Sequence, residues 1–126
     1  MENPTKVLIV EDDLITQQIL GLYMIDYDHI IVSSGEEALE ECKTNKYDII
    51  LMDIRLKAGF DGVKTFKNIK KIKDYNNIPI LAITAYAMRG DREYFLEEGF
   101  EGYLAKPFLK ENLIEIINTA LNKATV

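Results

Sequence analysis

Residues 7–13 read VLIVEDD, four apolar residues followed at once by three acidic ones. The apolar part is mostly β-branched and is bounded by charge, which predicts a buried β-strand. Similar apolar runs stand at 48–53 and 79–84, and the first of these also ends in an acid, Asp53. The sequence therefore places carboxylates at the ends of strands of its predicted core.

Short apolar runs alternate with longer amphipathic segments along the chain. Strands are expected at 7–10, 29–32, 48–53, 79–84 and 102–105. Helices are expected at about 14–24, after Ser34, and at about 62–73, 89–98 and 109–123, the first with Ile15, Ile19, Leu22 and Tyr23 at helical spacing. Continuous apolar strands alternating with helices are typical of a parallel sheet covered on both faces. We therefore predict one α/β domain over 1–126, a doubly wound (βα)5 fold with five parallel strands.

The composition is that of a globular domain, because 48% of the 126 residues are apolar and 29% are charged. The net charge is −6 and no basic stripe is present, which argues against binding to nucleic acid or to an anionic membrane surface. Cys42 is the only cysteine, so no internal disulfide can form, and no apolar run approaches the roughly 20 residues of a membrane span. These features predict a cytoplasmic protein.

In a parallel sheet of this kind, the working residues lie at the carboxyl ends of the strands. Four of the predicted strands end in chemically useful side chains. These are Glu11-Asp12-Asp13, Asp53, Thr84-Ala85 and Lys106-Pro107. On one edge of the sheet they would bring together several carboxylates, a hydroxyl and an ammonium group.

Crowded carboxylates repel one another, and a hard divalent cation relieves that repulsion. Mg²⁺ takes one or two carboxylates, keeps several waters and fills its shell from a phosphate. Lys106 would then pair with a phosphate oxygen, and the Thr84 hydroxyl would hydrogen-bond to another. Such a site transfers a phosphoryl group by positioning and charge stabilisation, with a carboxylate as nucleophile. Asp53 is the best candidate for the nucleophile because it ends the central, most buried strand.

Each of these features taken alone has a structural explanation. Acids after a strand often cap the next helix, Thr84 fits a side-chain turn, and Lys106 fits a solvated surface charge. His29, the only histidine, opens a strand and is interpreted as structural, and the lysines between 64 and 73 are interpreted as a solvated helix face. The occurrence of four such features on one sheet edge is what favours a functional site.

Three segments carry a resemblance to a known family: VLIVEDD at 7–13, IILMDIRL at 49–56 and ILAITAYAMRGDREYFLEEGFEGYLAKPF at 80–108. In this order they resemble the response-regulator receiver domains of two-component signalling, over about residues 6–123. The resemblance implies the flavodoxin-like form of the fold. The loop after Asp53 departs from the family pattern, since it lacks the usual proline and is one residue longer.

The resemblance implies a Mg²⁺ site around the phospho-acceptor Asp53, itself a metal ligand. Asp12 resembles the direct metal ligand and Glu11 an acid that acts through water. The backbone carbonyl of Arg55 would complete the metal shell. Arg55 and Tyr86 occupy the two positions that flank the phosphoryl group and influence how long it persists.

The resemblance also implies a conformational switch. Thr84 resembles the switch hydroxyl and Tyr103 the aromatic switch residue. Lys106 resembles the lysine that the family carries at this strand end. Pro107 follows it, as in the family, where this peptide bond is usually cis.

The leading prediction is a receiver that accepts a phosphoryl group from a sensor histidine kinase or a histidine phosphotransfer protein. It would be no enzyme beyond catalysing its own phosphorylation and dephosphorylation. With no output domain after it, it would act as a monomer or weak homodimer and bind a downstream partner through its fourth helix, fifth strand and fifth helix. That face comprises Arg89–Tyr94, Tyr103 and Phe108–Leu113. Two alternatives stay open: a receiver-like scaffold that takes no phosphate, and a phosphatase with an aspartyl nucleophile, a class that wants a second acid at position 55.

Overall fold

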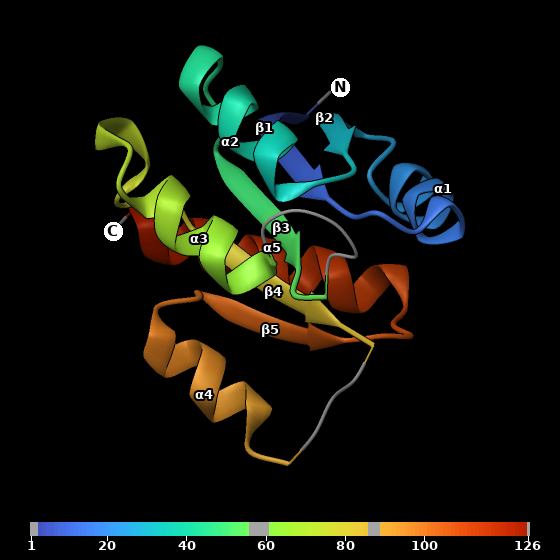
Figure 1. Ribbon diagram of the computed structural model, residues 1–126. Coiled ribbons are helices and arrows are strands. Elements are labelled where there is room, and N and C mark those ends of the chain that lie inside the picture. Colours follow the sequence, from blue (N-terminus) through green and yellow to red (C-terminus); the bar gives the residue numbers. More distant parts are fainter. Residues whose placement is uncertain (1–2, 56–60, 86–88, 126) are drawn as a thin grey trace.

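The structure is a computed structural model that describes residues 3–55, 61–85 and 89–125 (Figure 1). The described strands are β1 Asn3–Val10, β2 Tyr27–Val32, β3 Ile49–Asp53, β4 Ile80–Thr84 and β5 Gly102–Ala105. The described helices are α1 Leu14–Tyr23, α2 Gly35–Thr44, α3 Gly62–Lys70, α4 Asp91–Glu98 and α5 Lys110–Thr125, with a short 3-10 helix, η1, at Lys73–Tyr75. Strands and helices alternate as the sequence predicts.

Neighbouring strands of the sheet all run parallel, in the order β2-β1-β3-β4-β5. β1 lies between β2 and β3, and Val10 near its end pairs with Val32 on one side and Met52 on the other. The chain goes from β1 outward to β2 and then crosses back to β3, so the strand order reverses at β1. The predicted doubly wound α/β fold with five parallel strands is confirmed.

Helices cover both faces of the sheet. On one face, α2, α3 and α4 bury apolar side chains that include Ala38, Phe66 and Phe95. On the other face, α1 and α5 bury Leu20 and Leu113 among others. Figure 1 shows α3 in front of the sheet and α5 behind it. β3 and β4 are buried along their whole length, as expected of parallel strands that are covered on both sides.

Three helices begin where the sequence offers a capping side chain. Asp13, Ser34 and Asp61 stand at the N-caps of α1, α2 and α3. Each side chain accepts a hydrogen bond from the backbone N–H three residues further on, which satisfies a donor that the helix itself leaves unpaired. The caps of α1 and α2 fix the turns that follow β1 and β2, next to the carboxyl edge of the sheet.

Two helices are shorter than predicted. α3 ends at Lys70 rather than at residue 73 because the chain turns into η1, and α4 begins at Asp91 rather than at Arg89. Tyr75 of η1 is buried, and its hydroxyl donates to the Asn45 carbonyl at 2.7 Å. This contact ties η1 to the chain just before β3.

Lys70 does not belong to the solvated lysine face predicted for α3. Its Nζ donates to the Ile78 carbonyl at 2.6 Å, and the side chain is only partly exposed. Burial lowers the pKa of this lysine. Lys64 and Lys67 are exposed, as predicted.

The apolar face that the sequence suggests for α1 is wrong for Ile15, Ile19 and Leu22, whereas Tyr23 is partly buried and packs against the core. Ile15 and Leu22 are 69% and 68% exposed, whereas Leu20 and, just past the helix, Met24 are buried. The helix carries two apolar stripes, and packing against the sheet turns the other stripe inward. The outward stripe, called here the α1 patch, consists of Leu14, Ile15, Ile19, Leu22 and Ile25.

Candidate functional site

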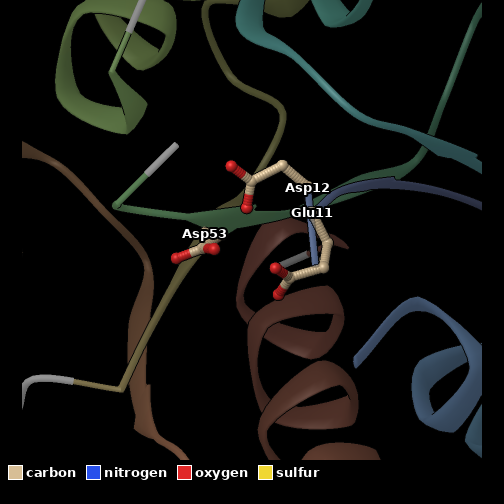
Figure 2. Close-up of side chains that lie close together, drawn as sticks. All are labelled: Glu11, Asp12 and Asp53. Atoms are coloured by element: carbon tan, nitrogen blue, oxygen red, sulfur yellow. The ribbon is translucent and has the colours of Figure 1, made fainter. Parts of the chain in front are cut away.

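The carboxyl ends of β1 and β3 lie side by side, because Val10 pairs with Met52. The strand order reverses at this point, and in doubly wound sheets such a point forms a crevice in which ligands bind. Glu11 and Asp12 directly follow β1, and Asp53 is the last residue of β3. Figure 2 shows the three carboxylates gathered there, and one oxygen of each lies within 4.8 Å of the others.

Lys106 reaches the same crevice from the end of β5. Its Nζ lies 2.6 Å from Oε1 of Glu11 and 3.5 Å from Oδ2 of Asp53. The backbone N–H of Lys106 donates to the Thr84 carbonyl at 2.8 Å, which fixes where the lysine leaves the sheet. One ammonium group therefore lies between two buried carboxylates that would otherwise repel each other. The Lys106–Pro107 peptide bond is cis, as predicted.

Glu11 is the most deeply buried of the three acids, at 1% exposed. Burial raises the pKa of its carboxyl to about 7; the hydrogen bond from Lys106 opposes this rise and the neighbouring Asp53 adds to it. The three carboxylates carry more negative charge than the ammonium group of Lys106 balances by itself. A hard divalent cation would supply that charge and favour the ionised forms of the acids.

The third acid of the 11–13 triplet has a different task. Oδ2 of Asp13 accepts from the backbone N–H of Thr16 at 2.9 Å and from its hydroxyl at 2.8 Å. The N–H of Asp13 in turn donates to Oε2 of Glu11 at 3.1 Å. Glu11 and Asp12 therefore belong to the acidic cluster, whereas Asp13 caps α1. The prediction of a functional site holds for the first two acids and the prediction of a helix cap holds for the third.

The donor set of the cluster fits Mg²⁺. The group consists of carboxylates, which are the oxygen ligands that this cation prefers, rather than the nitrogen and sulfur ligands of a zinc site. Asp12 is only partly buried, so the cluster is accessible to water and to an incoming phosphate. The Arg55 N–H donates to Oδ1 of Asp53 at 3.0 Å, which orients the carboxylate that is predicted to be the nucleophile. Ligation by the Arg55 carbonyl stays a prediction.

Comparison with known proteins identifies the family. The family model of the response regulator receiver domain matches residues 7–118. The chain belongs to this family. One relative of this receiver is hybrid signal transduction histidine kinase I of Dictyostelium discoideum, 36% identical over 95% of this chain but only 7% of that protein. Another is the polar-differentiation response regulator DivK of Brucella anthropi, 34% identical over 96% of this chain and 99% of DivK.

Solved receiver structures share the fold and include a metal-bound example. The receiver domain of the sensor histidine kinase PA1611 from Pseudomonas aeruginosa PAO1 has a TM-score of 0.86 and 33% identity, over 95% of this chain and 99% of that one. It holds a magnesium ion coordinated in its active-site cleft. The resemblance to receiver domains read from the sequence is thus confirmed, over 7–118 for the family model.

Of the two predicted switch residues, Thr84 lies on β4, next to the strand that carries Asp53, and Tyr103 lies one strand further along, on β5. Thr84 is the last residue of β4 and is buried. Tyr103, on β5, is partly buried, and its ring stacks on that of Phe95 in α4 with centroids 5.9 Å apart. Burial raises the pKa of the Tyr103 hydroxyl. Tyr86, predicted to influence the lifetime of the phosphoryl group, lies outside the described residues.

Gly62 supports the site in a way that the sequence pattern does not reveal. α3 begins at Gly62, so close to the end of β3 that an added Cβ would lie 2.5 Å from the Asp53 carbonyl oxygen and 2.6 Å from Cα of Ile54. The N–H of Gly62 also donates to the Ile54 carbonyl at 3.1 Å. Only glycine allows so close an approach of two backbones. The sequence signal is the pair Asp61-Gly62, which indicates a turn but does not indicate the contact of that turn with the end of β3.

Proposed function

We propose that this chain is a phosphoryl-accepting receiver, in which Asp53 takes a phosphoryl group from a histidine kinase or a histidine phosphotransfer protein with Mg²⁺ as cofactor. The observation that carries the proposal is the cluster itself. Glu11, Asp12 and Asp53 lie within 4.8 Å of one another, and Lys106 contacts two of them. A nucleophile, a set of metal ligands and a fixed cation thus meet at one point.

Each residue of the cluster has a task in the transfer. A carboxylate oxygen of Asp53 forms the new O–P bond while the P–N bond to the donor's imidazole breaks, and the electron pair of that bond stays on the imidazole nitrogen. Lys106, already 3.5 Å from Asp53, pairs with an oxygen of the arriving phosphoryl group, and the Thr84 hydroxyl donates to another. Mg²⁺ held by Asp12 and Asp53 would neutralise further charge on the phosphoryl oxygens.

Two other functions fit these residues less well. A phosphatase with an aspartyl nucleophile wants a second carboxylic acid two residues further on, and that position holds Arg55. A scaffold that takes no phosphate has no use for three clustered carboxylates, two of them buried, that repel one another. We infer that the chain catalyses only its own phosphorylation and dephosphorylation.

Incubation with Mg²⁺ and acetyl phosphate tests the proposal. Intact-mass spectrometry should show one added phosphoryl group, and hydroxylamine should remove it because an acyl phosphate is the product. Chelation of Mg²⁺ should prevent the modification. A mass that stays unchanged in the presence of both reagents would contradict the proposed function.

The Asp12→Ala variant should bind Mg²⁺ at least about tenfold more weakly, because the cation loses a carboxylate ligand. Isothermal titration calorimetry of the purified protein measures the dissociation constant directly. Asp26→Ala removes an exposed acid beyond the end of α1 and is the matched control for the change in net charge. Equal Mg²⁺ affinity in the two variants would show that Asp12 is not a ligand.

We further propose that phosphorylation reaches a partner through α4, β5 and α5. Thr84 pairs with Ala105 in the register of β4 and β5, and Tyr103 lies two residues before Ala105 on the same strand. The stacking of Tyr103 on Phe95 links β5 to α4. A movement of Thr84 toward a phosphoryl group on Asp53 would therefore reach α4 through direct neighbours, and the domain would act as a two-state element.

The Thr84→Ala variant should still accept a phosphoryl group but should not pass the change to this face. Beryllofluoride, a phosphoryl mimic, should shift the backbone amide signals of α4, β5 and α5 in the unaltered protein and leave most of them in place in the variant. Tyr94 and Leu109, which are 52% and 63% exposed, are the side chains of this face that a partner would bury. Equal shifts in both proteins would exclude Thr84 as the switch.

No helix in the ranges that the structure describes is long and apolar enough to cross a membrane. We propose a cytoplasmic protein, a monomer or weak homodimer, that binds neither nucleic acid nor membrane directly. The net charge of −6 argues against binding to nucleic acid or to an anionic membrane surface, and the buried free thiol of Cys42 fits a reducing compartment.

A further inference from the structure

Gln17 joins two turns at the carboxyl edge of the sheet. Its Nε2 lies 2.6 Å from the Glu11 carbonyl oxygen and 3.0 Å from Oγ of Ser33. A carbonyl oxygen can only accept, so the amide nitrogen of Gln17 must be the donor there. One partly buried side chain on the first turns of α1 thus connects the turn after β1 to the turn after β2.

The Glu11 backbone is consequently held on both sides. Its N–H donates to the Val32 carbonyl at 3.0 Å, and its carbonyl accepts from Gln17. A peptide unit is planar, so the Glu11 carbonyl lies in one plane with the N and Cα atoms of Asp12. Fixing this carbonyl therefore fixes the plane from which the Asp12 side chain leaves the backbone.

The second acceptor of Gln17 is itself anchored. The N–H of Ser33 donates to Oε1 of Glu37 at 3.1 Å, and Glu37 lies in the first turn of α2. The Glu11–Asp12 peptide is thus held in place by β1, β2, α1 and α2, and not by the β1–α1 turn alone.

We propose that Gln17 is a positioning residue for the acid pair Glu11 and Asp12, acting through the Glu11 carbonyl and not by contact with the cation. The inference rests on the proposed Mg²⁺ site and adds a residue whose loss weakens that site from outside it. Groups that orient metal ligands in this way typically account for about 10- to 100-fold in metal affinity.

The test compares Gln17→Met with Gln18→Met, because methionine keeps the length of the side chain but cannot donate, and Gln18 is exposed on the same helix. Calorimetric titration with MgCl₂ should give a dissociation constant about tenfold higher for Gln17→Met and an unchanged one for Gln18→Met. In the metal-free proteins, the amide signals of Asp12 and Asp13 should move only in Gln17→Met. Urea unfolding of each variant separates loss of stability from loss of positioning.

Ser33→Ala is a second variant, which removes only the exposed hydroxyl that Gln17 contacts. It should also raise the Mg²⁺ dissociation constant, but by a smaller factor than Gln17→Met. If Gln17→Met fails to fold, the result for Ser33→Ala tests the inference in its place. Unchanged Mg²⁺ affinity in a folded Gln17→Met protein would overturn the inference and leave the proposed Mg²⁺ site intact. If only Ser33→Ala folds, unchanged affinity in that variant would do the same. Unaltered protein that binds no Mg²⁺ would instead overturn the proposed function.

Discussion

The Asp53→Asn variant should take up no measurable phosphoryl group from acetyl phosphate, a loss of at least about 1,000-fold in rate, as is common when a nucleophile is removed. An amide lacks the negative oxygen that attacks phosphorus. The variant should fold, because asparagine has nearly the same shape and relieves the repulsion between position 53 and Glu11. Intact-mass spectrometry with acetyl phosphate and Mg²⁺ measures the result.

Asp61→Asn is the matched control for this experiment. Asp61 caps α3 by accepting from the Lys64 N–H, and asparagine caps a helix about as well as aspartate. The control should therefore be phosphorylated like the unaltered protein. An Asp53→Asn protein that gains a hydroxylamine-sensitive phosphoryl group at the normal rate would show that another carboxylate is the acceptor.

The Gly62→Ala variant should be less stable by about 1–3 kcal/mol, the usual range when extra atoms are forced into a packed site. The new Cβ would lie 2.5 Å from the Asp53 carbonyl oxygen, which is backbone and cannot rotate away. Either α3 or the end of β3 must therefore move. Displacing the nucleophile by about 1 Å can reduce the phosphorylation rate about 100-fold.

Gly21→Ala is the control, since it adds the same methyl group to a helix where the nearest atom, Cδ1 of Ile31, lies at 3.8 Å. Alanine is a better helix former than glycine, so this variant should be more stable by up to about 1 kcal/mol. Urea unfolding and the rate of acetyl phosphate modification together measure both effects. Equal stability and rate in the two variants would show that the contact between α3 and β3 is not needed.

The fold and most of the cluster follow from the sequence because parallel strands end on one edge. Continuous apolar runs identify the strands, and the residue after each run then lies at the carboxyl edge. Glu11, Asp12, Asp53 and Lys106 are therefore expected on one edge of the sheet, and the observed strand order places β1 beside β3 there.

The sequence does not determine contacts that depend on packing between elements. α1 carries apolar residues on more than one side, and only its packing against the sheet decides that Leu20 faces inward and Ile15 outward. Lys70 has the pattern of a solvated lysine, yet it lies partly buried because the chain after α3 turns back over its Nζ. The approach of Gly62 to β3 and the reach of Gln17 to Glu11 likewise depend on how whole elements are placed.

A partner that binds over the α1 patch and a partner that binds over α4 should differ in how their affinity depends on ionic strength. No residue of α1 is charged, whereas α4 carries Asp91, Arg92, Glu93, Glu97 and Glu98. A protein that binds over α1 would thus keep its affinity when sodium chloride is added and gain affinity with sulfate, since apolar burial is not screened. A protein that binds over α4 through charged contacts would lose affinity as salt rises, mainly through slower association. A salt titration of any captured partner would therefore identify the helix it covers before a structure of the complex is known.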